Sequence, residues 1–375
     1  MKILFTRFPL ESAEGGAERQ TFSLIRGLKD RGHDVQFLGS CHVLLEWCSR
    51  FQIPNSKLDI GPPPVTKWGA VSFAWRQFGM REKLQEARSK IQTDAVVMLS
   101  LSEKLLLNTQ SSIPHSQIFW LEHDPVGRWL TKNPWLPRLR KLSRQVTTIG
   151  VSELSKKIYV DLGWDPEKVI AIPNGIDVAH FPHPSLPRRG RVREGTNEQR
   201  ATTALHIGTV SRFAHEKGID LLLRAIEHLP NVQLRIVGKG PEESALKKLA
   251  HDLGIADRVR FETRVDDLTS FYQSLDAFVL SSRTHDPFGL VAAEAMALGV
   301  PTIVTDMCGI ASHLKDDEAL IVPADSTKAL IEAILKLGNP ELRAKMSAAG
   351  SGAICERFTC QKMVDAYEQL LTANK

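Results

Sequence analysis

The strongest chemical signal in the sequence is a pair of carboxylates eight positions apart, Asp286 and Glu294. Asp286 is expected just before a helix and Glu294 about two turns into it. The unpaired amides at this helix start are expected to be those of Phe288, Gly289 and Leu290. Carboxylates accept hydrogen bonds from sugar hydroxyls and helix-start amides bind anions, so the layout suits a glycosyl group, a phosphate and a ribose. In the alternative, Asp286 is only a helix cap and Glu294 a solvated helix residue.

Two cations, Arg212 and Lys217, lie on one short segment of the second half. The segment follows an apolar run and precedes a helical pattern, and ligands of open α/β sheets bind at such strand-to-helix loops. A guanidinium fork and a lysine point charge together suit a diphosphate. The spacing of a triphosphatase phosphate loop, G-x-x-x-x-G-K-[ST], is absent from this segment.

Two adjacent glycines, Gly15 and Gly16, follow the first apolar run and open a segment with Leu24, Ile25 and Leu28 on one helical face. Because they lack side chains, they allow a phosphate to approach the backbone amides of a helix start. A tight turn between a strand and a helix would need the same residues. The glycines alone therefore leave both interpretations open.

Short apolar runs rich in β-branched residues alternate with segments of helical periodicity along the whole chain. This alternation is typical of parallel sheets with crossover helices, and it predicts an α/β protein with about six strands in each half. The expected strands of the first half are Ile3–Thr6, Val35–Leu38, Ala95–Ser100, Gln117–Leu121, Val146–Val151 and Val169–Ile172. Those of the second half are Ala204–Gly208, Val232–Val237, Val259–Glu262, Ala277–Ser281, Thr302–Thr305 and Ala319–Val322.

The predicted organisation is two domains joined by a connector. The first domain is expected to span residues 1–180 and the second residues 204–355. Residues 181–203 are rich in Pro, Gly, Arg and Ser and lack an apolar period, which is typical of an exposed linker. Within residues 356–375 a final helix is expected from Gln361 to Leu371.

Composition excludes several classes of protein. Hydrophobic residues make up 42% of the 375 positions and charged residues 24%, which is typical of globular proteins and not of disordered or fibrous ones. No apolar run suits a membrane span or a signal peptide, so a cytoplasmic location is expected. The five cysteines contain no C-x-x-C pair, which argues against a zinc site or a disulfide framework. The net charge of +5 is mild, so no nucleic-acid partner is expected.

Taken in order, these and other motifs resemble the retaining glycosyltransferases of family 4. The matching pieces are Gly15-Gly16-Ala17-Glu18, Glu122-His123-Asp124, Val151-Ser152-Glu153, Ile172-Pro173-Asn174-Gly175-Ile176-Asp177, Arg212 with Glu216-Lys217-Gly218, Gly238-Lys239-Gly240-Pro241 and the segment from Asp286 to Pro301. The resemblance covers essentially the whole chain. It implies the GT-B fold, in which two Rossmann-like, doubly wound parallel-sheet domains face an interdomain cleft. The N-terminal domain would bind the acceptor and the C-terminal domain the donor, and the C-terminal helix would pack back on the N-terminal domain.

The resemblance also implies a role for each site residue. In the first domain, Gly15 and Gly16 would approach the donor diphosphate, and His123 would line the site near the reacting carbon. In the second domain, Arg212 and Lys217 would hold the diphosphate.

The remaining donor contacts follow from the same resemblance. Asp286 would meet the donor sugar and Glu294 the ribose, with the helix-start amides between them. Arg264 and Val265 would lie beside the nucleobase. The family motif has Glu where this chain has Asp286, and Gly is frequent where it has Thr263. Because the shorter carboxylate can reach a different hydroxyl, the donor sugar stays open, as does the nucleotide among UDP-, GDP- and ADP-sugars.

The expected reaction is transfer of the sugar with retention of its anomeric configuration. We prefer a route in which the nucleotide diphosphate departs from, and the acceptor attacks, the same face of the sugar. Stabilising the departing nucleotide diphosphate is then the main catalytic task. No D-x-D triplet occurs in the chain, so neither a metal nor another cofactor is expected. The dinucleotide fingerprint is also missing, because Gly240 is followed by Pro241 without a third glycine. A sugar-nucleotide epimerase or phosphorylase of the same fold, and a non-catalytic nucleotide-sugar-binding protein, remain as alternatives.

The acceptor is expected to be a glycan or a lipid-linked molecule of cell-envelope polysaccharide or lipopolysaccharide synthesis, because many members of the resembled family act there. Residues 128–144 mix tryptophans and leucines with six cations, a composition that suits peripheral contact with the inner face of a membrane. Trp75 and Phe78, with Arg76 and Arg81, would extend this patch. In the alternative, the leucines pack in the core, as a helix beside a buried strand requires.

Overall fold

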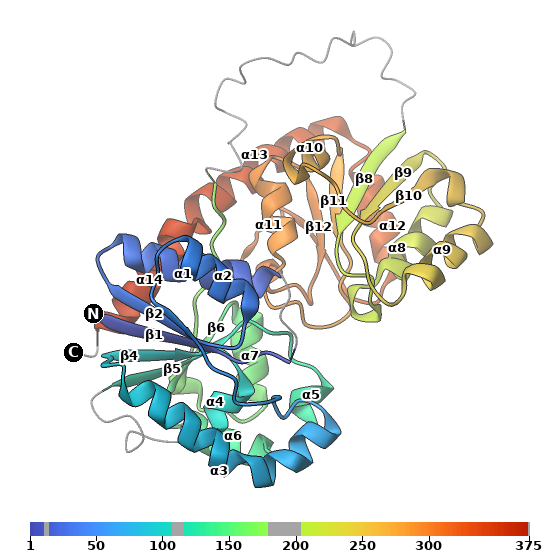
Figure 1. Cartoon of the computed structure of the whole chain (residues 1–375). Helices are drawn as coiled ribbons and strands as arrows, with labels where there is room; N and C mark the ends of the chain where they lie inside the picture. Colours follow the sequence, from blue (N-terminus) through green and yellow to red (C-terminus); the bar gives the residue numbers. More distant parts are fainter. Residues whose placement is uncertain (11–14, 107–115, 179–203, 374–375) are drawn as a thin grey trace. The chain divides into compact units, whose positions relative to one another are not determined.

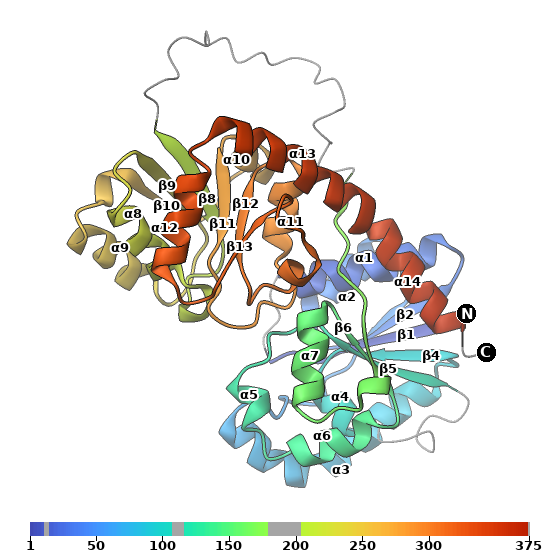
Figure 2. The same ribbon diagram turned by 180° about the vertical axis from the view of Figure 1, so that it is seen from behind.

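The computed structural model of the chain describes residues 1–10, 15–106, 116–178 and 204–373. These residues form two compact units (Figures 1 and 2). Unit 1 contains Met1–Gly175 together with Cys360–Lys375, and unit 2 contains Ile176–Thr359. The expected linker, residues 181–203, lies outside the described residues.

Unit 1 is built on a sheet of seven parallel strands in the order β3-β2-β1-β4-β5-β6-β7. The strands are β1 (Lys2–Arg7), β2 (Asp34–Gly39), β3 (Asn55–Lys57), β4 (Ala95–Met98), β5 (Gln117–Glu122), β6 (Thr147–Gly150) and β7 (Val169–Ala171). Six of them overlap the predicted strands. The seventh, β3, differs from the prediction because it is a three-residue edge strand of sequence Asn-Ser-Lys, in which no apolar pattern marks a strand.

Helices cover both faces of this sheet. They are α1 (Gly16–Asp30), α2 (His42–Arg50), α3 (Lys67–Ser89), α4 (Leu101–Leu106), α5 (Arg128–Thr131), α6 (Leu136–Ser143), α7 (Glu153–Asp161), the 3-10 turn η1 (Pro166–Lys168) and α14 (Cys360–Thr372). Helices α1, α2 and α14 lie on one face, and α3, α4 and α6 on the other (Figure 1). On the second face, Phe73, Leu105 and Leu139 pack with Leu4 of β1 and Val96 of β4 in one apolar core.

Unit 2 is built on a sheet of six parallel strands in the order β10-β9-β8-β11-β12-β13, and all six overlap predicted strands. The strands are β8 (Leu205–Val210), β9 (Val232–Val237), β10 (Val259–Glu262), β11 (Ala277–Leu280), β12 (Thr302–Thr305) and β13 (Leu320–Val322). The helices are α8 (Ile219–Glu227), α9 (Glu243–Asp252), α10 (Leu268–Gln273), α11 (Leu290–Ala297), α12 (Thr327–Lys336) and α13 (Pro340–Arg357), and the 3-10 turns are η3 (His215–Lys217), η4 (Ala256–Arg258) and η5 (Gly309–His313). Both units are therefore Rossmann-like α/β domains, which confirms the predicted fold class.

Each sheet has one point at which the strand order reverses. In unit 1 this point lies between β1 and β4, and in unit 2 between β8 and β11. Since all strands of a sheet are parallel, the loops after the two central strands leave from the same edge. Open α/β sheets bind their ligands at such a switch point. We therefore expect site residues in the loops after β1, β4, β8 and β11.

Helix α14 returns the chain to unit 1 and packs on α1. A Cβ at Gly27 of α1 would lie 2.4 Å from a methyl carbon of Val364, so the two helices approach closely at this glycine. At the end of α1, Arg31 donates to Glu368 at 2.6 Å and also to Asp365. A close apolar contact and a charged contact thus attach α14 to α1.

The apolar side chains of residues 128–144 belong mostly to the core. Leu130, Leu136, Leu139 and Leu142 are 1–7% exposed and pack in the core of unit 1. Core packing therefore accounts for these leucines, as the alternative interpretation of the sequence holds. Within the described ranges, no helix has the length and apolar character that a membrane span requires.

We predict that Gly27→Gln lowers the free energy of unfolding by about 1–3 kcal/mol, because the new side chain must displace the stiff Val364. Gly79→Gln is the matched control, since Gly79 also lies within a helix of unit 1 and a Cβ there meets nothing within 4 Å. Urea unfolding and limited proteolysis of the C-terminal helix measure the effect. Wild-type stability of Gly27→Gln would contradict the packing of α14 on α1.

Candidate functional site

The loop after β8 is held against the end of β11, at the switch point of unit 2. Gly218 has a φ of +61°, and a Cβ on it would lie 2.2 Å from the carbonyl oxygen of Ser281, so a side chain does not fit. The Ser281 hydroxyl lies 3.0 Å from the carbonyl oxygens of Lys217 and Gly218 and donates to them. The backbone of Lys217 is thereby fixed beside the loop that follows β11.

Lys217 and Asp286 form an ion pair across this switch point. Lys217 Nζ lies 2.7 Å from Asp286 Oδ2, and the two side chains are 20% and 12% exposed. The Ser282 hydroxyl donates to the same oxygen at 3.3 Å. The topology thus brings together a cation and a carboxylate that the sequence marks separately. A carboxylate has about four lone-pair positions, so Asp286 can accept further hydrogen bonds from ligand hydroxyls.

The backbone of Asp286 is attached to the segment that follows β12. Its amide donates to the carbonyl of Met307 at 2.9 Å, and its carbonyl accepts from the amide of Gly309 at 2.8 Å. These two bonds form an isolated parallel bridge between Asp286 and Cys308. The acidic loop is therefore held from two sides, by Lys217 and by the β12 loop.

Helix α11 begins later than the sequence predicts. Gly289 has a φ of +89° and is the N-cap residue, so the first helical residue is Leu290. Glu294 therefore lies little more than one turn into the helix, not two, and the amide of Phe288 precedes the helix. The prediction was wrong because the loop bound to the β12 segment continues through Gly289 before the chain turns helical.

Glu294 is oriented by a residue outside its own motif. The hydroxyl of Tyr272, a buried residue of α10, donates to Glu294 Oε2 at 2.9 Å. A carboxylate offers about four lone-pair positions for hydrogen bonds from hydroxyls. Glu294 thus keeps the acceptor character that the sequence prediction requires of it.

Arg283 attaches the acidic loop to α8. Its Nη1 lies 2.6 Å from Asp220 Oδ1, and its Nε lies 2.8 Å from Asp325 Oδ1. Its amide donates to the carbonyl of Glu216, immediately before Lys217, at 2.8 Å. Hydrogen bonds to Asp220 raise the pKa of Arg283, so it remains charged. The residue therefore connects both halves of the site in unit 2.

Arg212 and the pair Arg264 and Val265 occupy the outer part of the same sheet edge. The Arg212 side chain is 65% exposed and pairs with Glu216. Because an exposed ion pair contributes only about 0–1 kcal/mol, the guanidinium can exchange Glu216 for another anion at little cost. Arg264 is exposed and Val265 half-buried, and Thr263 alone separates them from the end of β10. Both follow a strand that lies two positions from β8 in the sheet.

In unit 1, the glycine turn opens α1 as the sequence predicts. Gly15 is the N-cap residue and Gly16 is the first helical residue, so the N-cap position itself offers no side chain to cap the helix. A Cβ on Gly15 would lie 3.1 Å from Glu18 Oε2, so the turn is tight. Both sequence interpretations, a tight turn and an anion approach, are compatible with this geometry.

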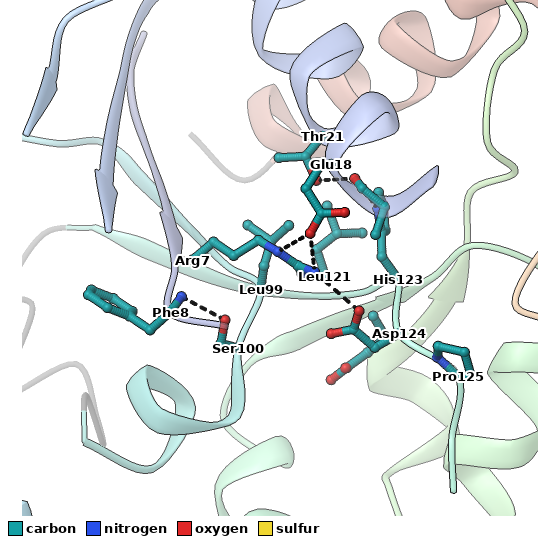
Figure 3. Close-up of polar contacts among 12 residues, drawn as sticks. Arg7, Phe8, Glu18, Thr21, Leu99, Ser100, Leu121, His123, Asp124 and Pro125 are labelled. Carbon is teal, nitrogen blue, oxygen red and sulfur yellow. Dashed lines mark hydrogen bonds and ion pairs between the residues drawn. The ribbon is translucent and has the colours of Figure 1, made fainter. Parts of the chain in front are cut away.

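Arg7, the last residue of β1, connects the glycine turn to the loop after β5 (Figure 3). Its Nε and Nη2 donate to Glu18 Oε1 at 3.0 and 2.7 Å, and Nη2 also donates to Asp124 Oδ1 at 3.2 Å. Arg7 and Glu18 are both 5% exposed. Removing one partner from such a buried pair is costly, because the other charge is left without compensation. Arg7 therefore fixes the start of α1 relative to Asp124 and its neighbour His123.

His123 is a buried, neutral imidazole. Its Nδ1 lies 3.3 Å from the carbonyl oxygen of Ala17, which can only accept, so Nδ1 carries the proton and Nε2 is the acceptor (Figure 3). Burial, assisted by the charge of Arg7, lowers the pKa of His123 to about 4. A group with this pKa is a weak base at neutral pH. The geometry therefore suits an orienting role for His123 better than proton abstraction.

A second buried group of charges supports the same loop. Lys104 Nζ lies 2.8 Å from Glu122 Oε1, and the hydroxyl of Tyr159 donates to Glu122 Oε2 at 3.0 Å. Glu122 directly precedes His123, so these contacts fix the end of β5. Across the part of the chain that the structure describes, no three His, Cys, Asp or Glu side chains are grouped in a way that could hold a metal ion.

Three residues that shape the site carry no role in the sequence-based prediction: Arg7, Tyr272 and Arg283. Arg7 does leave a signal, because a cation that ends an apolar strand is expected at the ligand-binding edge of the sheet. Arg283 lies inside the acidic segment but looks like an ordinary surface cation in the sequence. Tyr272 leaves no signal, since its contact with Glu294 depends on how α10 packs beside α11.

Comparison with known proteins identifies the family. Residues 14–180 match the family described as Glycosyltransferase Family 4, and residues 195–352 match that described as Glycosyl transferases group 1. The lipopolysaccharide core biosynthesis glycosyltransferase LpsE of Rhizobium meliloti is 35% identical over 167 residues, which cover 44% of this chain and 49% of LpsE. This chain thus spans about half the length of LpsE. The phosphatidyl-myo-inositol mannosyltransferase of Mycolicibacterium smegmatis is 28% identical over 356 residues, or 90% of this chain and 85% of that enzyme.

A solved structure shares the fold along the whole chain. The crystal structure of HepE from Anabaena in complex with UDP covers 100% of both chains with a TM-score of 0.80 and 18% sequence identity. Two parallel-sheet units and two glycosyltransferase matches define an enzyme class, the glycosyltransferases of GT-B fold. Within that class the chain belongs to family 4, as its motifs predict.

We predict that acid weakens unit 1 through His123. Its folded pKa of about 4 lies below the ordinary value of about 6.5, so the unfolded chain binds more protons between these values and stability falls as pH decreases through this window. Between pH 7 and pH 5 the loss is about 2 kcal/mol for this group. In the His123→Gln variant, urea unfolding at the two pH values should show a correspondingly smaller loss. The exposed His42 supplies the control variant His42→Gln, and an equal acid loss in both variants would contradict the assignment.

Proposed function

We propose that this protein transfers a sugar from a nucleotide diphosphate sugar to a hydroxyl group of an acceptor, with retention of the anomeric configuration. The ion pair of Lys217 and Asp286 at the switch point of unit 2 supports this most strongly. A cation there can hold a diphosphate, and a carboxylate beside it can accept hydrogen bonds from sugar hydroxyls. The pair therefore suits a ligand in which a diphosphate is joined directly to a sugar.

The other donor contacts are assigned along the same edge. Arg212 adds a second cation for the diphosphate, and Glu294 accepts the hydroxyls of the ribose. Arg264 and Val265 lie beside the nucleobase. In unit 1, the backbone amides at the start of α1 suit an anion such as a diphosphate. The similar fold of HepE, which was crystallised with UDP, makes a UDP-sugar the first donor to test.

In the proposed reaction, the bond between the anomeric carbon and the diphosphate oxygen breaks while the acceptor oxygen attacks from the same face. The acceptor's proton passes to the departing diphosphate oxygen. Lys217 and Arg212 stabilise the charge that develops on that leaving group. His123, which is neutral, orients a hydroxyl through Nε2 instead of removing a proton. The proposal requires no metal ion or other cofactor.

The proposed acceptor is a glycan or a lipid-linked molecule. Two relatives are named for lipopolysaccharide core biosynthesis and for mannosylation of phosphatidyl-myo-inositol. An acceptor of this kind would place the protein in the cytoplasm, in peripheral contact with the inner face of the membrane.

A donor screen followed by product analysis tests the proposal. Thermal shift with UDP-, GDP- and ADP-sugars selects the donor, and NMR of the product made in excess chelator reports the new linkage and its anomeric configuration. We expect one nucleotide series to bind and a retained linkage to form without added metal. An epimerised or phosphorolysed donor would instead favour a different enzyme on this fold, and donor binding without turnover would favour a binding protein. Turnover restored only by Mn²⁺ or Mg²⁺ would contradict the metal-independent route.

We predict that Lys217→Ala and Arg212→Ala each raise the activation free energy by about 3 kcal/mol, or roughly a hundredfold in kcat/KM, because each removes a charge from the leaving group. Lys248→Ala, which removes an exposed cation of α9, is the control. Lys217→Ala also leaves the carboxylate of Asp286 without its cation, so the unfolding of unit 2 is measured alongside. Wild-type turnover in the double variant would remove both residues from the mechanism.

We predict that Glu294→Gln and Asp286→Asn separate in their effects on binding. Glu294→Gln should weaken a bare nucleoside diphosphate, since the ribose contact is shared by every ligand of the series. Asp286→Asn should weaken the full nucleotide sugar more than the bare diphosphate, because its partner is the sugar. Calorimetry with both ligands measures this difference, and a larger loss of bare diphosphate affinity in Asp286→Asn would reverse the two assignments.

A further inference from the structure

Helix α3 is apolar on two opposite faces. Phe73, Met80 and Leu84 face the core of unit 1 and are at most 5% exposed. On the opposite side, residues spaced by three or four positions form a second apolar stripe, since such spacing places side chains on one helix face. Its members and their exposed fractions are Trp68 at 84%, Val71 at 51%, Trp75 at 75% and Phe78 at 73%. We call these four residues the α3 stripe.

The α3 stripe is unusual for this molecule. Eight large hydrophobic side chains are exposed among the described residues, and half of them lie in these three turns. Single exposed apolar residues are ordinary, whereas a contiguous group marks an interaction site. Burial of α3 against the core does not require the stripe, because that contact uses the other face. The stripe therefore needs a partner of its own.

Residues 128–144, which we call the basic segment, pack directly against the start of α3. Asn133 Nδ2 donates to the carbonyl of Pro64 at 2.7 Å, and Trp135 Nε1 donates to the carbonyl of Ala70 at 2.8 Å. The ring of Trp135 also contacts that of Phe73, with centroids 5.2 Å apart. Helices α5 and α6, which belong to this segment, thus lie beside α3 (Figures 1 and 2).

The charge beside the α3 stripe is positive. Residues 128–144 contain six cations and no acid, and all of these cations except Arg138 are exposed. Lys67, directly before Trp68, and Arg128 and Lys132 of the basic segment are all exposed. The two acids of α3, Glu82 and Glu86, come only after Phe78. The apolar end of the helix is therefore also its cationic end.

We propose that the N-terminal half of α3 docks on an anionic lipid bilayer. The rings of Trp68, Trp75 and Phe78 enter the interface between headgroups and acyl chains, where tryptophan is favoured, while Arg128 and Lys132 approach anionic headgroups. Docking would bring unit 1 to a lipid-linked acceptor, and this benefit rests on the proposed function. The docking itself requires neither donor nor turnover.

Charge favours a bilayer over a second copy of the chain. A symmetric dimer through the α3 stripe would bring two sets of cations together at the contact, and like charges in close approach are unfavourable. An anionic surface meets the same cations with attraction and offers apolar depth for the rings. One partner thus accounts for both the aromatic and the basic features.

The test uses the full chain with vesicles of phosphatidylcholine alone and of phosphatidylcholine mixed with phosphatidylglycerol. We expect flotation with the mixed vesicles only, together with a blue shift of tryptophan emission. The combined variant Trp68→Ser, Trp75→Ser and Phe78→Ser should bind about tenfold more weakly or worse, because it loses most of the apolar area of the stripe. Leu335→Ser, which removes an exposed leucine of α12 in unit 2, should bind as wild type does.

A second variant tests the cations separately. Lys67→Glu, Arg128→Glu and Lys132→Glu together should abolish the preference for anionic vesicles while leaving thermal unfolding unchanged, since all three residues are exposed. Unchanged flotation in either combined variant would overturn the proposal. So would a dimer that dissociates when the stripe is mutated, measured by light scattering, or binding to nucleic acid in place of vesicles. Sugar transfer to a soluble acceptor, assayed in parallel, keeps a failure of docking distinct from a failure of the proposed function.

Discussion

The parallel direction of every strand is the constraint on which the site depends. It collects the loops after β8 and β11 at one edge of unit 2, where Lys217 and Asp286 meet at 2.7 Å. If either strand ran the other way, its loop would leave from the opposite edge and the pair could not form. The ion pair is in turn held by backbone contacts, because Gly218 touches Ser281 and the Asp286 loop is bound to the segment after β12. The chemistry of the site is thus a consequence of sheet topology.

In unit 1, buried ion pairs hold the elements at the corresponding edge of the sheet. Near the switch edge, Arg7 of β1, Glu18 of α1 and Lys104 of α4 are only 3–5% exposed, and each charge needs a partner to offset its desolvation. The partners lie on different strands and helices, so satisfying the charges also fixes the loops relative to one another. The neutral state of His123 is a by-product of this arrangement, because burial and the cation Arg7 both disfavour a proton on its ring.

The sequence predicts more of the fold than of the site. The strands of unit 2 have continuous apolar runs, as β11 does, or alternate apolar and polar residues, as β9 does, so all six can be found from the sequence, whereas β3 is short and polar. Lys217 and Asp286 are recognisable by type and by position after a strand. Their mutual distance is not, because it depends on how two loops 69 positions apart are held. The helix start at Leu290 and the contact of Tyr272 with Glu294 also depend on tertiary hydrogen bonds that leave no periodic trace.

The same limit applies to α3. Its sequence shows apolar residues around most of the helix, and only the structure separates a face that packs in the core from a face that does not. The leucines of residues 128–144 illustrate the reverse case, since their basic surroundings suggest a surface but their side chains are buried. Composition can therefore identify an amphipathic region, and packing decides which of its apolar residues face solvent.

The return of α14 to unit 1 affects the order in which the chain can fold during synthesis. Arg31 and Glu368 are 337 positions apart, so the ribosome makes the whole of unit 2 before α14 can reach α1. Until then Gly27 of α1 lacks the helix that packs against it, and the nascent unit 1 remains a partly formed domain. Unit 2, whose residues are continuous from Ile176 to Thr359, can complete its core first. The domain that is translated first is therefore the one that finishes folding last.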